Sequence, residues 1–141
     1  MTNKQKLIAI MLLLNAGFLA AQQADDLIGT YRLPNDLEIE IFKTGDQYSG
    51  KIVALNGYQN GQTKDVKNPN KAKRNDLLLG KVIIEGLEFD EQEKEWVDAT
   101  IYGPEKGMLA NLKVTEMRDN EIEVVASKYF FWRTLKWQRT E

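Results

Sequence analysis

The sequence contains neither cysteine nor histidine among its 141 residues. Without cysteine there are no disulfide bonds or thiolate metal sites, and without histidine there are no imidazole-ligated metals and no triads that need an imidazole base. No Asp-x-Asp-x-Asp pattern indicates a calcium loop, and the acidic run "DEQEKE" at 90–95 is typical of a solvated hairpin tip. We therefore expect no metal and no cofactor, and only carboxylates remain as candidate catalytic groups.

Long apolar runs are absent except at the N-terminus. Residues 7–20 are apolar apart from Asn15 and Gly17, and they follow Lys4 and Lys6. This pattern is typical of a cleaved secretory signal, and the run is shorter than the roughly 20 residues of a membrane span. We expect cleavage after residue 21, a single mature domain of residues 22–141, and export to the periplasm or beyond. The alternative is a buried N-terminal helix.

An excess of positive charge is also lacking. The chain has 19 Lys and Arg against 21 Asp and Glu, a net charge of −2, and loss of Lys4 and Lys6 would move it to −4. This mild acidity argues against nucleic-acid binding. We expect a protein that is not an integral membrane protein.

The dominant pattern in the rest of the chain is a hydrophobic period of two. In "LEIEIF" at 37–42 and "EIEVVA" at 121–126, apolar side chains alternate with polar ones, as in half-buried antiparallel strands. Eight such segments are separated mostly by short turns, which favours an all-β, eight-stranded antiparallel barrel because closure removes exposed edges. The expected strands are 28–33, 37–43, 47–55, 79–87, 95–102, 108–117, 121–127 and 130–139.

One connection, residues 56–76, is unusually long for a compact domain. We expect it to form a lid at the barrel mouth. Asn68 and Pro69 suit the cap and first position of a short helical turn. Arg74 offers a forked donor to a loop carboxylate, either Asp65 or Asp76. The leucines of "LLLG" at 77–80 are expected to fix the end of the loop in the core, while the loop lysines either meet an anionic group or simply keep the lid soluble.

Five segments carry a resemblance to a known family: "IGTY" at 28–31, "YSGKIV" at 48–53, "DVKNPNKAKRNDLLLG" at 65–80, "ATIYGPEKG" at 99–107 and "FWRTLKWQR" at 131–139. In this order they resemble a bacterial secreted family catalogued as domain of unknown function 2147. The resemblance implies a lipocalin-like β-barrel. The chain departs from the family pattern at Tyr31, where Trp is usual, at Trp132, where Gly is usual, and in lacking a pair of cysteines.

The resemblance also suggests how one end of the barrel is closed. Gly29-x-Tyr31 is similar to the Gly-x-Trp start of lipocalins, in which an aromatic ring closes the barrel base beneath a basic side chain from the last strand. Arg139 or Arg133 could cover the ring of Tyr31 through a cation–π contact. The alternative is that Tyr31 is an ordinary core residue.

Four further residues are candidates for a binding site. Trp96 and Tyr102 are aromatic residues on one strand, and Trp132 lies in an aromatic-rich segment that could be exposed. Asp98 is exposed in one strand register, whereas in the other it is buried beside Tyr102 and needs a partner.

Three functions remain open at this point. The first is a non-enzymatic exported binder of a small apolar or amphipathic molecule. The second is a cell-envelope interaction module that binds protein or polysaccharide through the lid and the aromatic segment near Trp132. The third is an enzyme that uses carboxylates such as Asp98 without histidine.

Overall fold

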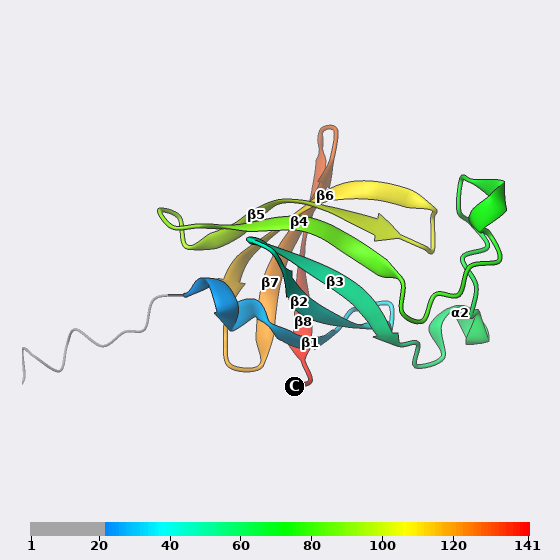
Figure 1. Cartoon of the computed structure of the whole chain (residues 1–141), viewed down its shortest axis with the longest axis horizontal. Coiled ribbons are helices and arrows are strands. Elements are labelled where there is room, and N and C mark those ends of the chain that lie inside the picture. Colours follow the sequence, from blue (N-terminus) through cyan, green and yellow to red (C-terminus); the bar gives the residue numbers. More distant parts are fainter. Residues whose placement is uncertain (1–21) are drawn as a thin grey trace, which may run out of the picture.

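The computed structural model describes residues 22–141, and the signal peptide expected over 1–21 lies outside them. Eight antiparallel strands form a closed barrel in chain order (Figure 1), which confirms the expected fold class. The strands are β1 (Gly29–Arg32), β2 (Glu38–Thr44), β3 (Gln47–Ala54), β4 (Val82–Asp90), β5 (Glu95–Gly103), β6 (Met108–Met117), β7 (Glu121–Lys128) and β8 (Phe131–Arg139). Within these residues no helix is long and apolar enough to cross a lipid bilayer.

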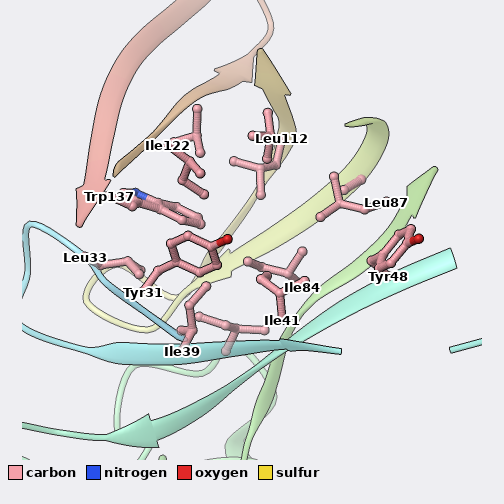
Figure 2. Packing of buried hydrophobic residues seen from close by; sticks show 14 of the residues in the cluster. Tyr31, Leu33, Ile39, Ile41, Tyr48, Ile84, Leu87, Leu112, Ile122 and Trp137 are labelled. Atoms are coloured by element: carbon pink, nitrogen blue, oxygen red, sulfur yellow. The ribbon is translucent and has the colours of Figure 1, made fainter. Parts of the chain in front are cut away.

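The barrel core is built from the alternating apolar residues. Ile39 and Ile41 of β2 are buried, while Glu38 and Glu40, which alternate with them, are only half-buried. Figure 2 shows such side chains from several strands, including that of Ile122 on β7, directed toward a common interior. Period-two alternation therefore forms one continuous core, as expected for a barrel with a single buried face.

A paired irregularity in β4 and β5 interrupts the alternation. Trp96 and Ala99 both face the core although they are three residues apart, because the register between β5 and β6 shifts between them. Asp98 adopts a φ of 66°, and Gly86 on β4, where an added Cβ would contact the carbonyl of Asp98, adopts a φ of 81°. Such a β-bulge re-aims side chains. It turns Asp98 to solvent and keeps Trp96 inside.

The short helix η1 (Ala24–Leu27) covers one end of the barrel. The indole Nε1 of Trp96 donates to the carbonyl of Ala24 at 2.9 Å, and the hydroxyl of Tyr31 donates to the carbonyl of Leu27 at 2.8 Å. Both hydrogen bonds lie against the buried side of η1. The two aromatic side chains therefore fix η1 in place and satisfy their own buried polar atoms.

The long connection between β3 and β4 contains two short helices, α2 (Tyr58–Gly61) and η2 (Lys71–Lys73). Its two limbs pair at an isolated bridge between Lys64 and Leu77. Of the three leucines expected in the core, only Leu78 is buried, because an extended segment presents alternate residues to opposite sides. β4 consequently starts at Val82, three residues later than expected.

The seam between β1 and β8 is short. Only Tyr31 with Arg139 and Arg32 with Gln138 pair across it, whereas β7 and β8 pair along eight residues each. Most of β8 therefore lacks a strand partner on its β1 side. The closed barrel therefore has a short seam at this point, and Figure 1 shows the β7–β8 hairpin projecting beyond the neighbouring strands.

Candidate functional site

A cavity of about 500 Å³ lies at the end of the barrel opposite η1. Its walls come from the β1–β2 turn, the start of β4, the β5–β6 turn and the mouth-side halves of β7 and β8. Most of the lining side chains are apolar, among them Leu33, Leu37, Ile83, Ile101 and Leu135. This size and lining are typical of a site for a small, largely apolar molecule.

Charged residues lie at the mouth of this cavity. Lys106, Lys128 and Arg133 contribute to its lining, with Glu105 as the acidic neighbour. Glu105 already accepts a hydrogen bond from the side-chain amide of Asn35 at 2.7 Å. Within residues 22–141, none of the three basic side chains forms an ion pair. The mouth therefore carries a net positive charge that a ligand anion can meet.

One polar atom of the cavity wall has no hydrogen-bond partner. The side chain of Trp137 on β8 is 2% exposed and lines the cavity, and its indole Nε1 is the only buried side-chain nitrogen or oxygen of the described chain without a partner. Figure 2 shows this indole among the core side chains close to Tyr31. Buried donors in native proteins are normally satisfied by protein, water or ligand. The Nε1–H of Trp137 is therefore a buried donor without an acceptor in the wall of the cavity.

The lid loop, residues 56–76, is held by a buried carboxylate. Asp65 accepts hydrogen bonds from the hydroxyl of Tyr102 at 2.7 Å and from the amide of Asn68 at 2.8 Å, and it pairs with the ammonium of Lys81 at 3.3 Å. Burial and then the hydrogen bond to Asp65 raise the pKa of Tyr102 above its usual range. The lid also packs closely on the β5–β6 turn, where Gly107 leaves no room for a Cβ against the carbonyl of Lys67. The lid is thus fixed beside the mouth, and none of its residues lines the large cavity.

Comparison with known proteins places the chain in a family. The family model described as "Uncharacterized protein conserved in bacteria (DUF2147)" matches residues 29–139. The chain belongs to this family. Among solved structures, HP1028 from Helicobacter pylori, described as belonging to the lipocalin family, is similar with a TM-score of 0.70 and 19% identity, covering 82% of this chain and 83% of that one. At this identity the likeness shows the fold alone. No curated protein matches the chain.

In this DUF2147 barrel the three residues expected at the closed end lie together. The guanidinium of Arg139 lies over the ring of Tyr31 at 5.6 Å and donates to the carbonyl of Ile28 at 2.9 Å. A Cβ on Gly29 would meet the guanidinium of Arg139, so the close approach requires glycine. Arg133, the other candidate cover for the ring, instead lies at the mouth of the cavity.

Two details of the lid differ from the sequence-based expectations. Arg74 donates from Nε to the carbonyl of Asn68 at 2.7 Å and forms no ion pair with a described carboxylate, because Lys81 and Tyr102 already occupy Asp65. The cap of η2 is Asn70, whose side chain accepts from the backbone of Ala72, rather than Asn68 followed by Pro69. The side chain of Asn68 is directed to Asp65 and to the backbone of Asn70 instead.

The remaining candidates are dispersed over the DUF2147 barrel. Tyr102 lines the cavity, Trp96 lies at the closed end, and Asp98 is exposed on the outer wall. Trp132 is exposed on the β7–β8 hairpin and does not line the cavity. Sequence reasoning did not single out Trp137 or Lys106, because period-two alternation does not indicate which inward residues border a void.

Proposed function

We propose that this protein is a non-enzymatic, lipocalin-like carrier of a small amphipathic molecule. The apolar part of the ligand fills the cavity, and an anionic group meets the basic residues at the mouth. The observation that supports this most directly is the apolar cavity of about 500 Å³ bordered by the unpartnered indole of Trp137. Export after removal of residues 1–21 is part of the same proposal, and the support for it is the apolar run at 7–20 that follows Lys4 and Lys6.

Two parts of the site would recognise different parts of the ligand. Arg133 and Lys106 would attract the anionic group. Because both side chains are exposed, water screens their charges, and each contact would strengthen ligand binding only modestly. The Nε1–H of Trp137 would donate to an oxygen carried deeper in the ligand once a small rotation of the indole turns this buried atom toward the cavity. Burial of the apolar chain would supply most of the affinity, since burial of apolar surface is the largest favourable contribution in such sites.

Carboxylate catalysis and the envelope-module alternative receive less support. Asp98, the carboxylate considered for catalysis, is exposed on the outer wall and does not border the cavity. Figure 1 shows the lid loop and the tip of the β7–β8 hairpin projecting in different directions, so the lid and Trp132 do not combine into one surface.

The test is calorimetric titration with a medium-chain fatty acid and with the alcohol of the same chain length. We expect the acid to bind more tightly than the alcohol. Arg133→Gln should weaken acid binding by about two- to fivefold and leave alcohol binding unchanged. Lys73→Gln, in the lid and away from the cavity, is the matched control and should change neither affinity.

Two further variants test the interior. Trp137→Phe removes the indole N–H but retains an aromatic ring, and should weaken binding of a ligand with an internal oxygen by about three- to tenfold. Ala126→Phe should fill part of the cavity and abolish binding. Failure of both the acid and the alcohol to bind the wild type, or undiminished binding by Ala126→Phe, would contradict the proposal.

A further inference from the structure

Four consecutive aromatic residues form the tip of the β7–β8 hairpin, and all four are strongly exposed. Tyr129, Phe130, Phe131 and Trp132 are 88%, 91%, 79% and 76% exposed. We call residues 129–132 the finger. Residues on both faces of the hairpin are exposed there, because the tip extends beyond the barrel (Figure 1) and β8 pairs with β1 only at its far end, at Gln138 and Arg139. So much contiguous exposed aromatic surface marks an interaction site.

The charge around the finger has one sign. Residues 124–135 contain Lys128 and Arg133 and no Asp or Glu, although acidic residues outnumber basic ones in the whole chain. The neighbouring start of β6 adds Met108 and Leu109, which are also exposed and apolar. Lys128 donates to the carbonyl of Leu109 at 2.7 Å and lies over the Tyr129 ring at 5.5 Å, so its charge stays at the base of the finger.

The turn at the tip contains a residue that local backbone geometry disfavours. Lys128 pairs with Phe131, so Tyr129 and Phe130 form a two-residue turn, and Tyr129 adopts a φ of 55°. Glycine, asparagine or aspartate normally occupies such a position, and a bulky residue there is a strained outlier. The sequence places a tyrosine at this exposed, strained site, although its ring is 88% exposed and does not pack into the core. Strain of this kind is found at functional sites.

We propose that the finger is a membrane-docking element that inserts into the interfacial layer of an anionic lipid bilayer. Tyrosine and tryptophan concentrate at the boundary between lipid and water because they present an apolar ring and a polar atom. The rings of Phe130 and Phe131 would enter the acyl-chain region beneath this boundary. Lys128 and Arg133 then lie at the level of the headgroups, where each basic residue gains from the negative surface potential. A projecting tip can insert into a fluid lipid bilayer at any point, whereas a protein partner would need a groove that matches the shape of the tip.

This docking would position the cavity as well. Lys128 and Arg133 flank the finger and also line the mouth of the cavity, so insertion of the finger brings the mouth to the lipid surface. A ligand could then pass between bilayer and cavity without crossing bulk water. The docking itself requires no ligand in the cavity, and it is therefore separable from the proposed carrier function.

The experiment is sedimentation with phosphatidylcholine vesicles prepared with and without phosphatidylglycerol. It is performed on the full chain and on the chain starting at Gln22, so that any contribution of residues 1–21 is recognised. We expect binding to require phosphatidylglycerol. The double variant Phe131→Ser/Trp132→Ser should bind about tenfold more weakly for each aromatic side chain removed. Leu77→Ser, which removes an exposed apolar side chain of another segment, is the matched control and should bind as the wild type does.

Two measurements guard against a variant that merely misfolds. Tyr129→Gly relieves the strained φ, so it should keep or raise the melting temperature while weakening vesicle binding. Quenching by brominated lipid chains should be strong in the wild type and reduced in Trp132→Phe, because Trp132 is the exposed tryptophan while Trp96 and Trp137 are buried.

Vesicle binding and lipid quenching together decide whether the finger docks on a membrane. Phosphatidylglycerol-dependent binding that is lost with the finger aromatics supports the proposal. Equal binding of wild type and finger variants, or absence of lipid quenching at Trp132, would overturn it. So would a dimer in lipid-free solution that finger substitutions dissociate while vesicle binding persists, because the finger would then be an interface between copies of the chain.

Discussion

Replacement of Asp65 by asparagine tests whether one buried carboxylate holds the lid in place. Asp65 is 1% exposed and its side chain interacts with Tyr102, Asn68 and Lys81. Asparagine preserves the size of the side chain, and rotation of its amide can preserve hydrogen bonds to the neighbours. The substitution therefore removes mainly the negative charge.

The expected loss of stability follows from the charge that Lys81 keeps after the substitution. The Lys81 side chain is 19% exposed, so its ammonium would be left largely buried without a counter-charge. Loss of one partner of a buried pair typically costs about 3–5 kcal/mol, and the partial exposure of Lys81 lowers this to about 2–4 kcal/mol. Asp76→Asn, at an exposed lid position with no ion pair among the described residues, is the control and should change stability by about 0.5 kcal/mol or less.

The assay is urea denaturation followed by tryptophan fluorescence, combined with limited proteolysis of residues 56–76. Asp65→Asn should lower the free energy of unfolding and expose the lid loop to protease. Adding Lys81→Met should recover part of the loss, because both buried charges are then gone. Equal stability of Asp65→Asn and Asp76→Asn, or a double variant less stable than Asp65→Asn alone, would refute this account of the lid.

Two further predictions concern the packing of the lid and the response to alkali. Gly107→Ala should destabilise the protein by about 2–3 kcal/mol more than Gly45→Ala, because both glycines have positive φ but only a Cβ at Gly107 meets the carbonyl of Lys67; equal losses of melting temperature would refute this. Burial raises the pKa of three tyrosines to about 12, so above about pH 10 the unfolded state loses protons that the folded state keeps. These tyrosines are Tyr31, Tyr48 and Tyr58. Stability should therefore fall between pH 10 and 12, with about 1.4 kcal/mol per pH unit as the upper bound for each tyrosine and less for Tyr48 and Tyr58, whose hydroxyl groups are better solvated. A flat denaturation midpoint over this range would contradict the assignment.

The barrel could be predicted from the sequence because its determinants are local. Alternation along 37–42 and 121–126 indicates strands with one buried face, and short polar turns between strands require neighbours in sequence to be neighbours in space. The long connection at 56–76 was visible for the same reason, since it is the one place where this pattern stops. The family resemblance and the lipocalin-like fold are both confirmed.

The details that could not be predicted depend on pairing between distant segments. The bulge at Asp98 arises from the register of β5 against β6, and strict alternation along β5 cannot reveal it. Arg74 was expected to meet a carboxylate because its chemistry suits one, but Lys81 reaches Asp65 from outside the loop. The cavity beside Trp137 depends on how short the seam between β1 and β8 is, which is a property of the closed barrel.

The central claim is that the barrel carries a small amphipathic molecule, and native mass spectrometry of the protein purified without detergent tests it most directly. We expect a reproducible added mass that is lost on unfolding, and whose organic extract yields an anionic amphiphile. Ala126→Phe, purified in the same way, should lack that mass. A wild type that shows only the mass of its own chain and takes up no fatty acid would contradict the claim.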